Sequence, residues 1–483
     1  MNKLLHVSVS LSVALAVSGC GLLAPRYQSP PLPVAETWPI AASVATDGGE
    51  AAANSANSAN SADNIGWRDF FVDARLQQLI ALSLQNNRDL RVAVLNIERA
   101  RAQYRVQRAD RVPSVNASGS MIRQKAPSAT TTTAGGYPIT EVYSADAGAA
   151  FELDLFGRVH NLSRAALERY LAQDAARRSA QLSLIAEVAN AYLTLAADRE
   201  LQRLAQETLT SQESSYKLIQ QQHERGAVSG LDLAQAQTTV EAARVDAARY
   251  AGNVIQDVNA LTLLVGTTLD NGLLPEDFAA QVTGLQPLPA GLPATVLLRR
   301  PDVLQTEHQL RAANANIGAA RAAFLPSITL TGSIGSASSE LSDLFKSGTG
   351  TWSFIPQITV PIFQGGRLLG NLSIANTDRD IALAQYERSI QAGFREVADA
   401  LALTQTLAQQ RQAQQSLAEA AAKTYELSQA RYKSGRDSYL SLLDSQRSEY
   451  AAQQGLIATR LAEQSNRVAL YKVLGGGWRE RNP

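Results

Sequence analysis

Cysteine is almost absent from this chain, because Cys20 is the only one. A single cysteine excludes an internal disulfide framework. Net charge is also missing, since Lys plus Arg and Asp plus Glu both number 44. The balanced and interspersed charges are typical of solvated helix faces and give no sign of a polyanion, so we expect no nucleic-acid partner.

Histidine is scarce as well, and the four histidines lie far apart in the sequence: His6, His160, His223 and His308. The chain contains no metal-ligand spacing, no nucleophile elbow and no phosphate-binding loop. The sequence therefore predicts that the protein is not an enzyme, with no catalytic residue, no metal site and no dissociable cofactor.

The single cysteine lies at the end of a signal-peptide pattern. Lys3 precedes the apolar run from Leu4 to Val17, which is shorter than the about 20 residues that a membrane-spanning helix needs. The run ends in VSGC, which resembles the lipobox of bacterial lipoproteins, with Gly21 next. This resemblance implies that residues 1–19 are removed and that Cys20 carries N-palmitoyl and S-diacylglycerol lipid. An ordinary signal peptide with an incidental cysteine is the alternative.

Most of the chain consists of two copies of one pattern. VPSVNASGS at 112–120 matches LPSITLTGS at 325–333, 213 positions later. EVANAYLTL at 187–195 matches EVADALALT at 396–404, 209 positions later. A duplication of this length is not a solenoid of short units. We predict an N-terminal extension at 20–73, a first repeat at 74–266, a connector at 267–293, a second repeat at 294–475 and a C-terminal segment at 476–483.

Each copy has the same predicted order of elements, namely a helix that ends at a proline, a β-hairpin and a long helix hairpin without proline. In the first copy these are 74–111, 114–155 and 158–265, with a turn at Gly226. In the second copy they are 294–324, 327–363 and 367–474, with a turn at Gly435. The first helix and the return helix of each hairpin are about half as long as the helix between them. We therefore expect the two shorter helices to lie end to end beside the longer one.

The predicted strands alternate apolar and polar residues. Ile328, Leu330 and Ile334, for example, alternate with Ser and Thr. Such alternation is typical of a half-buried strand and is also the weak signature of a transmembrane β-strand. Four strands are too few to close a barrel, and an open edge is not stable in lipid. A barrel shared among several copies of the chain is therefore expected.

Four stretches resemble the outer membrane factors of tripartite efflux pumps, the TolC-like channels, and among them the OprM-type lipoproteins of resistance-nodulation-division (RND) pumps. They are FELDLFGR (151–158), VPIFQGGR (360–367), RRPDVLQTEHQLRAANANIGAARAAFLPSITLTGS (299–333) and SGRDSYLSLLDSQRSEYAAQQ (434–454). The resemblance implies a mixed α/β membrane protein. It further implies a homotrimer with a TolC-like α-barrel in the periplasm and a shared 12-stranded transmembrane β-barrel in outer-membrane lipid.

The same resemblance implies a passive exit duct that docks to a periplasmic adaptor and an inner-membrane RND transporter. Leu440, Asp444 and Arg447 would form the periplasmic gate, where the first copy has Leu231, Gln235 and Thr238. The residues expected to contact the adaptor at the hairpin ends are Gly226, Val228, Ser229, Leu231, Gly435, Arg436, Ser438 and Tyr439.

Two other functions remain open. A periplasmic adaptor lipoprotein also carries a helix hairpin, but it has one hairpin, whereas this chain has two and each follows a strand pair. A duct that serves metal efflux or type I protein secretion is the alternative within the channel class, because a wide aqueous tube selects its cargo poorly.

Overall fold

The computed structural model describes residues 23–36, 38, 65–125, 139–276, 278 and 294–476. The chain divides into two compact units. The first unit is built from Met1–Pro31, Asn96–Asp174 and Gln305–Tyr386, and the second from Leu32–Leu95, Ala175–Leu304 and Glu387–Pro483.

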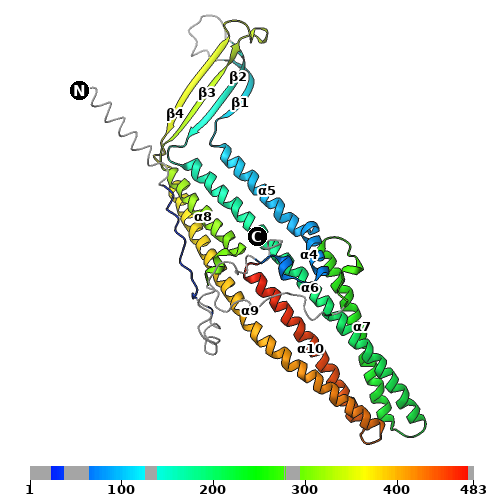
Figure 1. Ribbon diagram of the computed structural model, residues 1–483. Helices are drawn as coiled ribbons and strands as arrows, with labels where there is room; N and C mark the ends of the chain where they lie inside the picture. The colour runs from blue at the N-terminus through cyan, green and yellow to red at the C-terminus, as the bar shows by residue number, and fades with distance from the viewer. Residues whose placement is uncertain are drawn as a thin grey trace. The chain divides into compact units, whose positions relative to one another are not determined.

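The first unit contains a four-stranded antiparallel sheet in the order β1-β2-β3-β4 (Figure 1). The strands are β1 Ser114–Lys125, β2 Ile139–Leu153, β3 Ser327–Ser338 and β4 Gly350–Thr359. Each hairpin comes from one repeat, and β2 pairs with β3 to join the repeats. Within the described residues β1 and β4 each have a single partner strand, so both are edges of the sheet.

The strand register separates the two faces of the sheet, since successive residues point to opposite sides. On one face, two sets of neighbours run across the four strands from β1 to β4. The first set is Val115, Ala149, Gly332 and Phe354, and the second is Ala117, Ala147, Ile334 and Trp352. Serines and an aspartate meet on the other face, where Ser118 Oγ donates to Asp146 Oδ2 at 2.8 Å. Ser333 and Ser353 also bond there at 2.8 Å. One face is therefore apolar and the other polar, as the alternation predicts.

Most of the remaining described residues are helical. The helices are α3 Trp67–Phe70, α4 Ala74–Asn86, α5 Arg88–Ala109, α6 Arg158–Glu224, α7 Gly230–Val265, α8 Pro301–Ala322, α9 Arg367–Lys433 and α10 Tyr439–Val473, with short 3-10 turns at Asn271–Leu273, Ala294–Arg299 and Leu341–Asp343. α6 and α9 each have 67 residues, which is about 100 Å at 1.5 Å per residue. None of the helices in the described ranges combines the length and the apolarity required to cross a bilayer.

The single helices predicted at 74–111 and 294–324 are wrong, because both are interrupted at matched positions. Asn87 is extended, with φ −62° and ψ 132°, and its Oδ1 accepts a hydrogen bond from the Leu90 amide at 2.9 Å. Asn87 therefore caps α5. In the second copy α8 begins at Pro301, and a proline disfavours helical geometry at the preceding Arg300.

The same two residues join the helices of each repeat within the second unit. Asn87 Nδ2 donates to the carbonyl oxygen of Leu264, at the end of α7, at 2.9 Å. Arg300 donates through a terminal guanidinium nitrogen to the carbonyl oxygen of Val473, at the end of α10, also at 2.9 Å. The return helix of each repeat, α7 or α10, therefore ends where α5 or α8 begins, so these two helices follow one another end to end.

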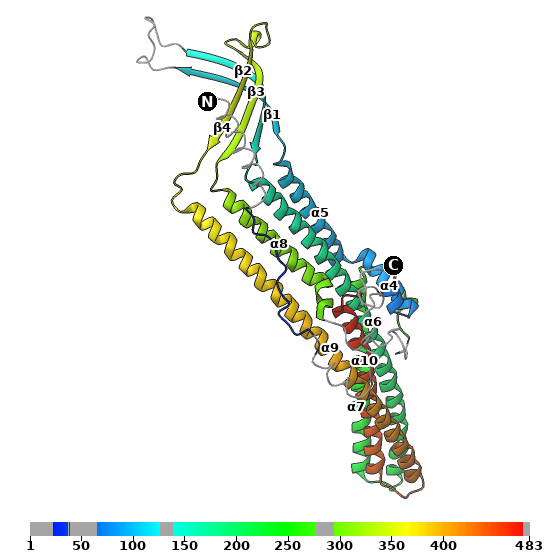
Figure 2. The same ribbon diagram turned by 60° about the vertical axis from the view of Figure 1, so that its left-hand side comes forward.

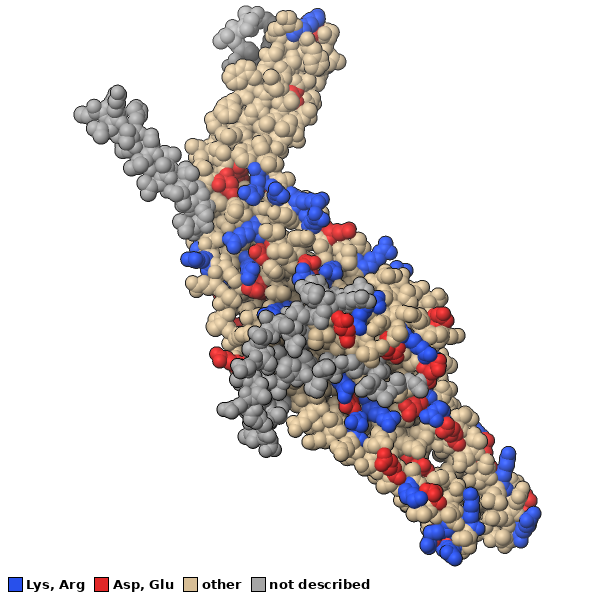
Figure 3. Space-filling model, in the orientation of Figure 1, with Lys and Arg blue, Asp and Glu red and all other residues tan. Residues whose placement is uncertain are grey.

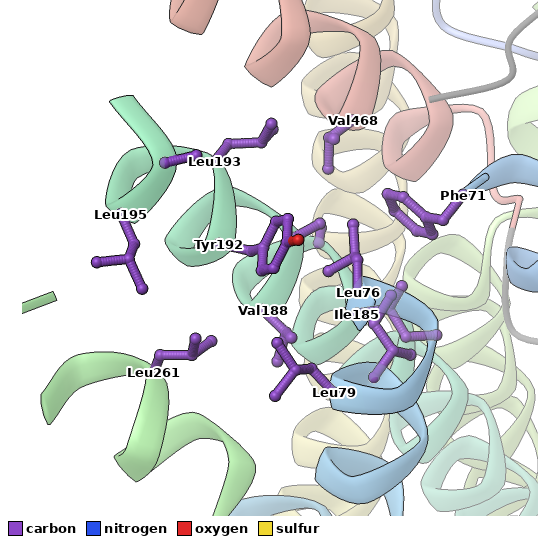
Figure 4. Packing of buried hydrophobic residues seen from close by; sticks show 14 of the residues in the cluster. Phe71, Leu76, Leu79, Ile185, Val188, Tyr192, Leu193, Leu195, Leu261 and Val468 are labelled. Carbon is purple, nitrogen blue, oxygen red and sulfur yellow. The ribbon is translucent and has the colours of Figure 1, made fainter. Parts of the chain in front are cut away.

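The main apolar core of the second unit gathers side chains from both repeats (Figure 4). Leu76 and Leu79 of α4 pack with Val188 and Tyr192 of α6 and with Val468 of α10. Burial of such side chains stabilises the fold by about 1.5–3 kcal/mol each. This core fixes α6, α7 and α10 to one another and leaves the hairpin ends to be held by a smaller cluster.

Candidate functional site

The turns of the two helix hairpins lie side by side at one end of the second unit (Figures 1 and 2). In the first turn Gly226 has φ 72°, a left-handed conformation that glycine adopts without strain. Ser229 then caps α7, since its Oγ accepts from the Asp232 amide at 3.2 Å and Asp232 Oδ2 accepts from the Ser229 amide at 3.1 Å. This reciprocal capping box fixes the direction in which α7 leaves the turn.

The second turn has the same backbone conformation but is held by different side-chain contacts. Gly435 also has φ 72°. Arg431 forms a two-pronged ion pair with Asp437, at 2.7 and 2.8 Å. The hydrogen bonds from Arg431 lower the pKa of the Asp437 carboxyl below its usual value. Ser438 caps α10 by accepting from the Ser441 amide at 3.3 Å.

A small apolar cluster joins the two hairpins behind these turns. It consists of Ile219, Ala236, Tyr439, Leu442 and Leu443. Tyr439 is only 7% exposed, and its burial raises the pKa of its hydroxyl. α10 therefore starts with the Tyr439 ring turned into the cluster and not toward the surface of the turns, unlike the other residues predicted to contact an adaptor.

The other predicted contact residues are placed at the surface of the turns, with Val228 half-buried. Ser229, Arg436 and Ser438 are exposed, and Leu231 is 67% exposed. A Cβ added at Gly226 or Gly435 would meet no atom within 4 Å. The hairpin ends therefore present an open surface that includes an exposed leucine.

The three predicted gate residues share one face of α10. Leu440 is 58% exposed, and Asp444 and Arg447 are exposed too. The intervening Leu442 and Leu443 are buried, so the gate face points away from the chain's own packing. No ion pair within the described part of the chain involves Asp444 or Arg447. In the matched face of α7, Leu231 and Thr238 are exposed and Gln235 is half-buried.

A polar network between the return helices α7 and α10 was not predicted from the sequence. Tyr450 of α10 donates to Asp246 Oδ2 of α7 at 3.1 Å, and Arg249 pairs with the same aspartate at 2.8 Å. Gln454 Nε2 donates to the Tyr250 hydroxyl at 3.2 Å. Burial, reinforced by the Asp246 charge, raises the pKa of Tyr450. These residues follow no recognisable motif, so only the packing of α7 on α10 reveals them.

In the described part of the chain, no three His, Cys, Asp or Glu residues are grouped so that they could hold a metal ion. Cys20 and the predicted signal peptide lie outside the described residues. The arrangement is a pair of helix ends with an exposed charged face, together with a sheet that has one apolar face.

Known proteins share both the sequence and the fold. The outer membrane efflux protein family matches residues 79–267 and 292–476. The toluene efflux pump outer membrane protein TtgC of Pseudomonas putida is 49% identical over 98% of this chain and 96% of its own length. The outer membrane protein OprJ of Pseudomonas aeruginosa is 44% identical over the same shares. The open state of the MtrE outer membrane channel of Neisseria gonorrhoeae has a TM-score of 0.82 at 39% identity, covering 95% of this chain and 99% of MtrE. The chain therefore belongs to the outer membrane efflux protein family.

Proposed function

We propose that this outer-membrane protein is the exit duct of a tripartite RND-type efflux pump, through which drugs, solvents or other small molecules leave the periplasm passively. The sheet carries this proposal. It has one exposed apolar face, with Trp352 79% exposed and Phe354 61% exposed. The side of the sheet seen in Figure 3 carries few charged side chains. The efflux functions named for TtgC and the channel named for MtrE support the same reading.

Among the described residues, β1 and β4 have no strand on their outer sides. These edges support assembly from several copies, because an open edge in lipid leaves backbone groups unsatisfied. We propose a homotrimer, in which three sheets make a 12-stranded barrel and the helices continue the tube in the periplasm. The repeat also supplies a register for the contact between copies. Ala149 of β2 lies opposite Gly332 of β3, and their counterparts in the other repeat are Ile358 of β4 and Gly119 of β1. Ile358 of one copy should therefore face Gly119 of the next.

The hairpin ends are proposed to contact the periplasmic adaptor, which in turn connects the duct to the inner-membrane transporter. A photo-crosslinking residue at Ser229 or Ser438, both exposed, is expected to capture the adaptor in cells that express the complete pump. The same residue at Ser342, exposed in the loop between β3 and β4, is the matched control. Capture from Ser342 with none from the hairpin ends would contradict the orientation.

Leu440, Asp444 and Arg447 are proposed to close the duct at rest. Copies related by a three-fold axis would place these residues in an apolar, an acidic and a basic ring in series. Isolated exposed ion pairs contribute only about 0–1 kcal/mol each, so contacts with the adaptor could reverse the closure. The energy for transport must come from the partner transporter, and the acidic ring should favour cations.

Cys20 is proposed to anchor the chain by its lipid, and the chain that follows it supports this. Asn314 Nδ2 of α8 donates to the carbonyl oxygen of Pro25 at 2.7 Å, and Arg321 donates to that of Leu23 at 3.2 Å. These contacts hold the segment against α8, the helix that leads into β3. The mass of the mature N-terminal peptide checks the lipid directly, and an unmodified Cys20 would contradict it.

A further inference from the structure

Several arginines line one face of α5, the helix of the first repeat that leads into β1. Arg101, Arg105 and Arg108 are spaced by four and three residues, which places them on one side of the helix. Arg111 follows two residues after the helix ends, and all four are exposed. Basic side chains gather over this part of the surface (Figure 3). No ion pair recorded for the described residues involves any of the four.

This arginine face lies directly beside the sheet. α5 ends at Ala109 and β1 begins at Ser114, so Arg101 is about 12 Å along the helix from its end. The first residues beyond the arginines are apolar and exposed, with Val112 at 60% and Val115 at 73%. A change from exposed arginine to exposed valine within a few residues is the pattern expected where a protein surface passes from phosphate headgroups into acyl chains.

In the second repeat, the face of α8 that corresponds to the arginine face of α5 is covered by the N-terminal segment. α8 matches α5 at an offset of 213, which aligns Arg101, Arg105 and Arg108 with Asn314, Gly318 and Arg321. The N-terminal segment covers these three positions of α8. Asn314 and Arg321 bond to its backbone at 2.7 and 3.2 Å, and a Cβ at Gly318 would lie 2.7 Å from the Cβ of Ala24.

The covered face of α8 therefore carries the segment that leads to Cys20, since Leu23 is three residues beyond that cysteine. No described segment occupies the matched face of α5, which presents arginines instead. The two repeats thus use equivalent faces differently, one for a segment that leads to the proposed lipid and one for exposed positive charge.

We propose that Arg101, Arg105, Arg108 and Arg111 bind the phosphate groups of acidic phospholipids in the periplasmic leaflet of the outer membrane. The planar guanidinium fork fits phosphate oxygens in pairs, and a basic residue near an anionic bilayer surface strengthens binding by about fivefold. The proposal rests on the orientation given under Proposed function. It gives the first repeat an attachment to the bilayer by charge, where the second repeat has the segment after Cys20.

The test measures retention of phosphatidylglycerol by the purified, assembled full-length protein in mild detergent, with phosphatidylcholine as the uncharged comparison. In the variant R101Q/R105Q/R108Q/R111Q the apparent affinity for phosphatidylglycerol should fall more than about tenfold, given about fivefold for each arginine. Retention of phosphatidylcholine should not change. High salt should reduce the affinity of the unmodified protein in the same direction.

The control variant R88Q/R99Q removes two positive charges from other faces of the same helix and should keep the affinity. A fourfold Arg→Lys variant retains the charges and should keep most of the affinity, which separates loss of charge from damage to the fold.

Unchanged affinity in the fourfold Gln variant, or an equal loss in the control, would overturn the proposal. Displacement of the lipid by inorganic phosphate would point to a free-anion site and overturn it as well. Loss of assembly with undiminished lipid affinity would assign the face to a second copy. Lipid retention is measured on purified protein without an adaptor. A failure of the lipid proposal can therefore be told apart from a failure of the proposed function, which is tested by crosslinking from Ser229 to the adaptor in cells.

Discussion

Replacing Asp444 and Arg447 together by alanine is expected to open the resting channel. Both side chains lie on an exposed face of α10 together with Leu440, which is 58% exposed. In a three-fold assembly the change removes a complete acidic ring and a complete basic ring. Single-channel conductance in planar bilayers should therefore rise several-fold, and cells should become sensitive to large antibiotics such as vancomycin that the closed duct excludes.

The matched positions of the first repeat supply the control. Gln235 and Thr238 carry no charge, and Gln235 is half-buried in its own chain, so replacing both by alanine should change conductance much less. The hydrogen bond from Tyr450 to Asp246 still ties α10 to α7 further along the helix. The opening is therefore expected to be confined to the hairpin end. If the variant with alanine at 444 and 447 forms an intact trimer and its conductance is unchanged, Asp444 and Arg447 do not form the gate.

Replacing Arg300 by alanine is expected to destabilise the protein strongly. The Arg300 side chain is 9% exposed and contacts Glu396 and Asp302, each at 2.7 Å. It also holds the Val473 carbonyl oxygen at the end of α10. Removal of one partner of a buried ion pair costs about 3–5 kcal/mol. We expect about 3 kcal/mol here, because the two carboxylates are partly exposed and water can solvate them.

The thermal loss of helical circular dichroism and of the oligomer on mild gels measures this effect. Arg395→Ala is the matched control, because Arg395 lies on the same helix as Glu396, has a 78% exposed side chain and pairs with Asp399 at only 3.8 Å. An exposed pair of this kind contributes about 0–1 kcal/mol. Equal shifts for the two variants would show that Arg300 does not hold the joint between α8 and α10. Arg300→Lys should be intermediate, since an ammonium group cannot form the two-pronged contact that Arg300 makes with the two carboxylate oxygens of Asp302, at 3.0 and 2.7 Å.

The repeated elements could be predicted from the sequence, because alternation, glycine turns and the absence of proline are local signals. The strand faces containing Val115 and Ile334 depend on a period of two that a single sequence displays. The breaks at Asn87 and Arg300 were missed because the helical pattern continues across them. The first helix is interrupted by a side-chain cap at Asn87, which is a weak signal within a long periodic segment. The second is interrupted by Pro301, a strong helix-breaking signal that the sequence itself displays.

The candidate site was predictable in position but not in every contact. Exposure of Leu231 and Leu440 follows from helical periodicity near a glycine turn. The burial of Tyr439 depends on how two hairpins far apart in the sequence pack together, which no local pattern specifies. The same holds for the hydrogen bond from Tyr450 to Asp246, because these two residues are 204 positions apart in the sequence. Long-range packing of this kind enters only with the tertiary structure.

The central claim is that copies of this chain share one barrel, and a disulfide between the proposed edges tests it most directly. The register between copies places Gln357 of β4 opposite Ser120 of β1 in the next copy, on the polar face of the sheet. Residues directly opposite are about 4.5–5.5 Å apart, within the range that a disulfide spans. In Asn116→Cys/Gln357→Cys, the control, the two positions are four residues out of register.

The measurement is the mass of the protein on a denaturing gel after mild oxidation in cell membranes, with and without reductant. For Ser120→Cys/Gln357→Cys we expect a band of three linked protomers that returns to one protomer on reduction, and for the control no such band. A protomer-sized band from Ser120→Cys/Gln357→Cys, in membranes where the protein is folded and oxidation is complete, would contradict the shared barrel.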